Sequence, residues 1–310
     1  MTTATAIKPT DERVERLNAV STRRYIDPDQ ALTGTLGDGQ VLADELLSLS
    51  ELDVFATLTR EQKIKLSREE IASITNEGIR FEAVLEAGFA LQVVYADDLT
   101  DPRITYLLHE MGEETRHQRV FVRLLQQLQA TAKNPLDRPI VRFVQRRAIR
   151  RIISKPALFY TLVLGGEEIP DLLQKVASEH PDTDPFLADV NRYHRQEEAR
   201  HLAFARLMLP EVWQKTSLTD RLAVRFVAPL IIGGMFDMLI HPGVYETIGL
   251  PGWETWKAAN RSPRRVALRQ EATRPILRAL FDAKVLTPGG VPKPWRRLCG
   301  VDAQGQPVAA

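Results

Sequence analysis

Cysteine and net charge are both scarce in this sequence. Cys299 is the single cysteine among 310 residues, which excludes a disulfide within the chain and is compatible with a reducing compartment. The 41 lysines and arginines nearly balance 40 aspartates and glutamates, giving a formal net charge of +1. That balance argues against a surface devoted to binding nucleic acid.

Long apolar runs are missing as well. The first 17 residues lack the apolar core of a secretory signal. The most apolar later stretch, residues 227–240, is too short to cross a bilayer and contains Asp237, so we expect a buried helix there. These features predict a cytoplasmic protein that does not contact a membrane.

No alternating strand pattern and no hairpin signal is present, and helical periodicity dominates. The sequence therefore predicts an all-α fold. Its organisation is expected to be a partly irregular arm (1–35), a helical domain (36–285) and an irregular tail (286–310). The segment "LGGEE" is not a G-x-G-x-x-G motif after a strand, which argues against a flavin or nicotinamide domain.

Four long helices are predicted, at about 67–97, 101–133, 136–178 and 185–208. Ser67 and Glu70 suggest a capping box at the start of the first. Lys155-Pro156 is expected to break the third, and Pro210 to end the fourth. Shorter helices are expected at about 11–20, 40–50, 53–59, 220–240 and 263–283.

The spacing E-x-x-H occurs in both the second and the fourth predicted helix. Glu114 precedes His117, and Glu198 precedes His201, by three residues. Residues three apart share a helix face, so each pair can reach one ion together. Each motif is preceded by another glutamate and has an arginine just before its histidine. Glu113 and Glu197 rotate away from these faces, so we expect them to support the ligands or to face solvent, paired with Arg116 or Arg200.

A two-metal site in a four-helix bundle also needs one glutamate from each of the other two helices. In the first helix, Glu82 lies within an apolar stripe, where a carboxylate is costly unless it is neutralised or ligated. In the third helix, Glu167 lies at the margin of the apolar stripe and Glu168 further round. Glu167 is the preferred candidate, and Glu168 stays open because the nearby Pro170 distorts the helix.

The fourth helix carries one histidine more than such a site requires. His194 lies four residues before Glu198 and shares its face. It is either a seventh ligand or a hydrogen-bonding support for one.

These motifs, together with the phrase "YLLHEMGEETRHQRVF" (residues 106–121), resemble the p-aminobenzoate N-oxygenase (AurF-like) family. The resemblance covers roughly residues 40–240. It implies a ferritin-like four-helix core with additional helices, a homodimer, and a non-haem di-iron centre that activates O₂ to oxidise an amine. By position, the resemblance implies these metal ligands: Glu82, Glu114, His117, Glu167, His194, Glu198 and His201.

The expected activity is O₂-dependent oxidation of a substrate amine, an arylamine in the best-known members, through a peroxo-di-iron species to hydroxylamine, nitroso and nitro products. Carboxylates and imidazoles suit iron, with manganese as a substitute. Electrons must come from an external donor, a ferredoxin or a reductase. The arginine-rich run 142–155 is either a solvated helix face or a docking patch for an acidic partner. The alternatives are iron oxidation or storage, and a manganese- or zinc-dependent hydrolase.

Overall fold

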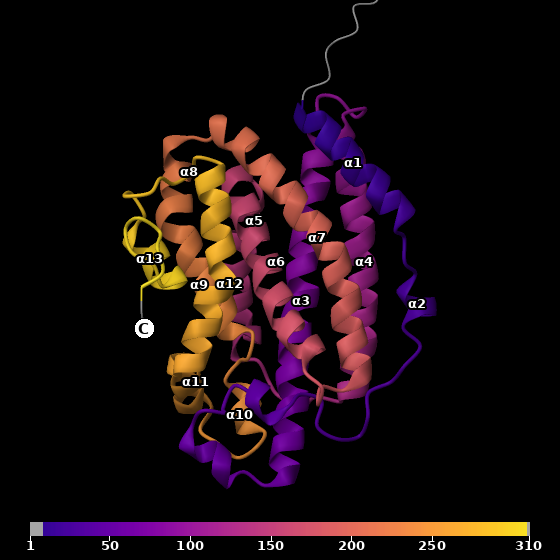
Figure 1. Cartoon of the computed structure of the whole chain (residues 1–310), viewed down its shortest axis with the longest axis vertical. Helices are drawn as coiled ribbons and strands as arrows, with labels where there is room; N and C mark the ends of the chain where they lie inside the picture. The colour runs from indigo at the N-terminus through magenta and orange to yellow at the C-terminus, as the bar shows by residue number, and fades with distance from the viewer. Residues whose placement is uncertain (1–8, 309–310) are drawn as a thin grey trace, which may run out of the picture.

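The core of the protein is a bundle of four long helices. The computed structural model describes residues 9–308, and within that range it contains helices and no strand. The bundle consists of α3 (Arg60–Val94), α4 (Pro102–Leu128), α6 (Pro156–Glu179) and α7 (Pro185–Gln214) (Figure 1). Short connections make α3–α4 and α6–α7 tightly packed antiparallel pairs. The prediction of an all-α bundle is confirmed.

Shorter elements surround this bundle. Helix α1 (Pro9–Arg23) lies against α4 and α7, α12 packs on α6, and α13 packs on α12 and α9. The remaining bounds are α2 (Pro28–Ala31), 3₁₀ turns Asp44–Leu46, Asp53–Thr57 and Pro135–Asp137, α5 (Pro139–Ile153), α8 (Leu218–Leu222), a π turn Ala223–Val227, α9 (Ala228–Met238), α10 (Gly243–Glu246), α11 (Gly252–Arg261), α12 (Pro263–Asp282) and α13 (Lys293–Cys299).

Two predicted helix ends were wrong, the start of the first helix and the end of the second. Helix α3 begins at Arg60 because Thr59 and Gln62 form the capping box. The polar groups expected to cap it serve other contacts: Ser67 binds the Val41 amide, and Glu70 binds Ser48. Helix α4 ends at Leu128, since the next residue adopts a left-handed conformation with φ of 51°.

The fourth helix and the tail also differ from expectation. Helix α7 runs through Pro210 to Gln214, and Val212 and Trp213 pack against the core beyond the proline. That packing compensates for the one backbone hydrogen bond that proline removes. The tail is not wholly irregular: α13 inserts Trp295 and Cys299 into the core with no exposed surface.

The apolar segment near residue 230 is buried on one face only. Ile232 is fully buried, whereas Leu230 is 65% exposed, which corrects the expectation of a buried helix. The helical run Leu218–Glu246 that includes it is long and apolar enough to cross a membrane by length and composition, and 33% of its most apolar window is buried.

Glycines allow the bundle helices to approach closely. A Cβ at Gly165 would lie 2.8 Å from Ile232 of α9, and one at Gly166 would lie 1.7 Å from the Phe81 ring of α3, so α6 approaches these helices too closely for a side chain at either position. The same holds between α3 and α6, where a Cβ on Gly88 would lie 2.4 Å from the Phe159 ring.

We expect Gly88→Ala to lower the free energy of unfolding by about 1–3 kcal/mol, because Phe159 is packed edge-on against Phe89 and has no room to move. Gly112→Ala is the matched control: it lies in α4 with no atom near its added methyl group, and we expect it to stabilise by up to about 1 kcal/mol. Urea unfolding of both variants measures the difference. Equal stabilities would contradict the packing argument.

Candidate metal centre

All seven residues predicted as ligands converge inside the bundle. Each is at most 4% exposed, and they come from all four long helices. Glu82 lies on α3, Glu114 and His117 on α4, Glu167 on α6, and the remaining three on α7: His194, Glu198 and His201. Burying four carboxylates together is unfavourable unless positive charge accompanies them.

Two glutamates occupy the middle of the cluster. Glu114 lies 3.3 Å from Nδ1 of His117 and 3.3 Å from Nδ1 of His201. Glu198 makes the same two approaches, at 3.3 Å and 3.1 Å. The two E-x-x-H motifs therefore interleave, and each central carboxylate faces both histidines. Such an arrangement would allow each carboxylate to be shared between two ions.

The third histidine faces the same centre from one side. Nε2 of His194 lies 3.2 Å from Glu82 and 3.4 Å from Glu198. Its other nitrogen, Nδ1, lies 3.0 Å from the side-chain oxygen of Gln174. With Nδ1–H donating to that oxygen, the lone pair of Nε2 points into the cluster.

A crossed set of ion pairs supports the other two histidines. Nε2 of His117 on α4 lies 2.9 Å from Glu197 on α7, while Nε2 of His201 on α7 lies 2.8 Å from Glu113 on α4. Two arginines pair with these supporting carboxylates across the same helix interface. Arg116 on α4 contacts Glu197 on α7 at 3.0 Å, and Arg200 on α7 contacts Glu113 on α4 at 2.8 Å.

This crossing decides between the two roles that the sequence left open for Glu113 and Glu197. Both are buried, at 2% and 1% exposure, so neither faces solvent. They fix the ring orientation of His117 and His201 so that Nδ1 of each histidine faces the centre. Pairing with arginine was expected, but the partner across the helix interface was visible only in the tertiary structure.

The two adjacent glutamates of α6 point in different directions. Glu168 pairs with Arg206 on α7. Glu167 is 2% exposed, lies beside Glu198, and has an oxygen with no hydrogen-bond partner. Of the two, Glu167 is the one directed at the cluster.

Glu110 is a further member that the sequence reasoning missed. It is fully buried on α4, neither of its oxygens has a hydrogen-bond partner among residues 9–308, and it groups with Glu114 and His201 within 4.8 Å. Its position four residues before Glu114, on the same helix face, was the signal that pointed to it.

Burial and mutual repulsion set the protonation of the cluster. Burial, reinforced by Glu114 and Glu198, raises the pKa of Glu82 well above its usual value. Burial raises the pKa of Glu110 to about 8 and lowers that of His194 to about 4. Burial alone would lower the pKa of His117, but hydrogen bonds to Glu114 and Glu197 raise it to about 9. Without metal, the cluster therefore holds protons that bound cations would displace.

The donor set fits two divalent cations. Three groups place their ligand atoms within 4.8 Å of one another: Glu82 with His117 and His194, Glu110 with Glu114 and His201, and Glu114 with His117 and Glu198. Buried oxygens without a hydrogen-bond partner remain on Glu82, Glu110, Glu114, Glu167 and Glu198. Oxygen and imidazole donors of this kind suit iron and manganese.

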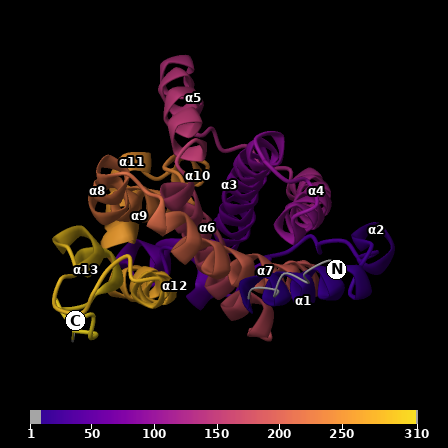
Figure 2. The same cartoon turned by 90° about the horizontal axis from the view of Figure 1, so that it is seen from above.

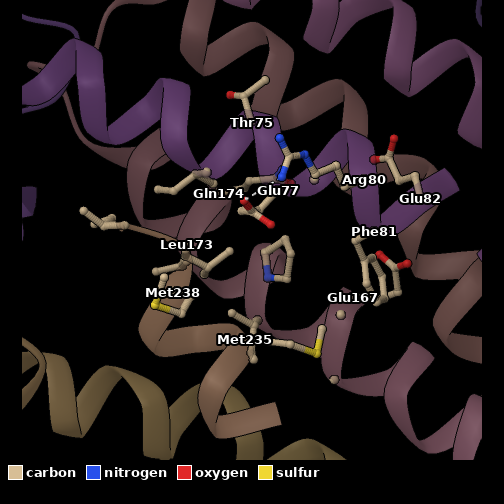
Figure 3. Close-up of a pocket in the computed structure, with 18 of the residues that line it drawn as sticks. Thr75, Glu77, Arg80, Phe81, Glu82, Glu167, Leu173, Gln174, Met235 and Met238 are labelled. Carbon is tan, nitrogen blue, oxygen red and sulfur yellow. Dashed lines mark ion pairs between the residues drawn. The ribbon is translucent and has the colours of Figure 1, made fainter. Parts of the chain in front are cut away.

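A cavity of about 600 Å³ reaches the cluster from one side. Glu82 and Glu167, both labelled in Figure 3, form part of its wall, and His194 is a further lining residue. Across the cavity from the α3 side chains lie Met235 and Met238 of α9. A substrate in this cavity would meet the cluster at Glu82, Glu167 and His194.

The far end of the cavity includes another buried carboxyl group. Glu70 is 1% exposed and accepts hydrogen bonds from the amide and hydroxyl of Ser48, which in turn contacts Tyr245. Burial raises the pKa of Glu70 to about 7, from an ordinary value of 4.5. The protonated form is thus favoured in the folded state.

This gives a pH-dependent contribution to stability. As the pH rises from 4.5 through 7, the unfolded chain loses the Glu70 proton first, so the folded protein loses up to about 3 kcal/mol of stability. Glu70→Gln keeps an acceptor for Ser48 and removes the titration. We expect its stability relative to the unmodified protein to increase by that amount between pH 5 and pH 8 in urea unfolding. Glu179→Gln, a change at an exposed residue, is the control. If the curves of unfolding free energy against pH ran parallel for Glu70→Gln and the unmodified protein, this prediction would be contradicted.

The fold and the site define a class: a helical-bundle protein with a buried carboxylate–histidine centre suited to two metal ions. The model of the family described as "P-aminobenzoate N-oxygenase AurF" matches residues 8–283. The chain belongs to this family, which is a family of oxygenases with a di-iron centre, and the resemblance seen in the sequence is confirmed.

Curated proteins from mycobacteria are similar in sequence to this protein. "Uncharacterized protein Rv0885" of Mycobacterium tuberculosis and "Uncharacterized protein Mb0909" of Mycobacterium bovis are each 26% identical over 196 residues. The alignment covers 62% of this chain and 57% of each relative, so the chain spans little more than half of their length.

Proposed function

We propose that this protein is a cytoplasmic, O₂-dependent N-oxygenase that oxidises a substrate amine at a di-iron centre. The observation that carries the proposal is the third histidine. His194 joins the two interleaved E-x-x-H pairs and forms part of the cavity wall, so a nitrogen-rich centre meets a space able to hold an organic substrate.

The proposed ligands follow from the two sides of the cluster. Glu82, His117 and His194 would hold one ion, and Glu167 and His201 the other, with Glu114 and Glu198 shared between them. Glu110 is proposed as an additional carboxylate on the His201 side, because its oxygens are buried without a partner. When bound, two ferrous ions supply the two electrons that O₂ activation requires.

The protein's own groups orient and protect this chemistry. Glu113 and Glu197 hold the histidine rings through their outer nitrogens, and Arg116 and Arg200 balance the two supporting charges. The apolar cavity wall excludes water and leads an amine nitrogen to the side of Glu82 and Glu167. A carboxylate there can accept a proton from the amine as it is oxidised.

We propose an acidic ferredoxin or reductase as the electron donor, docking on α5. This helix stands out from the body (Figure 2) and carries five arginines: Arg142, Arg146, Arg147, Arg150 and Arg151. One of them, Arg142, forms an ion pair with Asp137, and among the described residues the other four have no acidic partner within 4.0 Å. Such a patch attracts a partner of opposite charge. A homodimer, as in the family resemblance, is part of the proposal.

The test begins with metal analysis of protein from iron-supplemented cells, where we expect about two irons per chain. The reduced protein is then exposed to O₂ with and without amines, and O₂ consumption and oxidised amine are measured. An absence of O₂ consumption by the reduced, iron-loaded protein would overturn the proposal. Consumption with accumulation of ferric mineral but no amine product would favour iron storage. Substrate turnover by protein loaded with zinc alone, without O₂ consumption, would favour a hydrolase.

A further inference from the structure

We infer that the substrate is an amine with a long apolar body, bound along α3 with its nitrogen at Glu82 and Glu167. The inference deepens the proposed function and rests on it for the assignment of the amine end. It is carried by the length and the lining of the cavity beside the metal centre.

The cavity extends far beyond the space that a single small ring needs. Its wall includes Glu82 and also Glu70, twelve residues earlier on α3, which corresponds to about 18 Å along the helix. A volume of about 600 Å³ lies within the range of sites that bind drug-sized ligands. A compact arylamine would leave most of this space unfilled.

The side chains between the two ends are predominantly apolar. Helices α3, α5, α6 and α9 contribute many of them, and representative members are Ile74, Leu85, Ile149, Leu162, Leu173 and Met238. Figure 3 shows Leu173 and Met238 on the side of the cavity away from Glu82 and Glu167. The flexible thioethers of Met235 and Met238 suit a chain of variable shape.

Charged groups also line the cavity. Two carboxyl groups beyond the proposed ligands, Glu70 and Glu77, line the cavity. The arginines there are held by protein acceptors: Arg80 binds Asp137 at 2.7 Å, and Arg265 binds Asn260 at 3.1 Å. The third, Arg264, donates to Ser50 and to the Leu47 carbonyl.

Nε and Nη2 of Arg264 take part in neither of its two contacts, so the charges on the wall do not exclude an anionic group from the far end of the cavity. The length of the cavity distinguishes this substrate class from a compact arylamine.

The test measures binding separately from turnover. Iron(II)-loaded protein is titrated anaerobically with n-alkylamines of increasing length, below their micelle concentrations, by isothermal calorimetry. We expect Kd to tighten about fourfold per added methylene until the chain reaches the length of the cavity. Equal binding of short and long amines would overturn the inference.

Two substitutions at one position locate the bound chain. Met238→Trp fills the cavity away from the proposed ligands, so the gain in affinity with chain length should stop at a shorter amine. Met238→Leu conserves volume and should leave the dependence of Kd on chain length unchanged. An unchanged series in a folded Met238→Trp variant places the chain elsewhere and overturns the inference.

Exposure of the same samples to O₂ separates the two proposals. Binding that depends on chain length, without formation of oxidised amine, would contradict the N-oxygenase proposal but support the inferred long apolar ligand. Equal oxidation of short and long amines would support the N-oxygenase proposal and contradict the inferred substrate class.

Discussion

Glu198→Ala is expected to reduce the metal content from about two ions per chain to less than one. Glu198 lies within 3.4 Å of all three histidines, so its loss removes a donor from both sides of the centre. Losing a support for a ligand typically weakens metal binding about 10–100-fold, and we expect the loss of this shared ligand to exceed that range. Mass-spectrometric metal analysis and competition with a chelator measure the change.

Controls separate loss of metal from loss of fold. Gln196→Ala alters an exposed residue on the same helix and is expected to retain two ions. Circular dichroism of Glu198→Ala should show unchanged helix content, because the apolar core of the bundle does not include Glu198. A folded Glu198→Ala variant that keeps two tightly bound ions would contradict its central place.

Glu197→Gln and Glu113→Gln are each expected to weaken metal binding by about 10–100-fold without altering any proposed ligand. Glutamine can still accept a hydrogen bond from the histidine, but it carries no charge. Each change leaves an arginine, the mostly buried Arg116 or the buried Arg200, with less charge compensation. It also removes the negative charge that makes His117 or His201 a stronger donor.

Because the two carboxylates serve different histidines, each substitution is expected to weaken a different ion. Stepwise metal titration should show one weak and one nearly normal site in each single variant, and two weak sites in the double variant. Exposed Glu179→Gln is the matched control. Normal binding of both ions in either single variant would show that the crossed pairs do not position the histidines.

Much of the centre was predictable because helical periodicity is a local property. The E-x-x-H spacing, the burial of Glu82 in an apolar stripe and the placement of His194 beside Glu198 all follow from rotation about one helix axis. The four long helices were found for the same reason. Their ends were less accurate, since Thr59 and Gln62 competed with Ser67 and Glu70 as a capping box and only long-range contacts occupy the latter pair.

The tertiary structure alone decided how one helix meets another. Which of Glu167 and Glu168 faces the cluster depends on Arg206 of α7, which takes up Glu168. The crossed pairing of Glu113 with His201 and Glu197 with His117 depends on the register between α4 and α7, which no single-helix pattern encodes. The sequence by itself determined the helices and the kinds of donor on each face. Packing determined which donors share a centre, because distances between helices are set by side chains far apart in the chain.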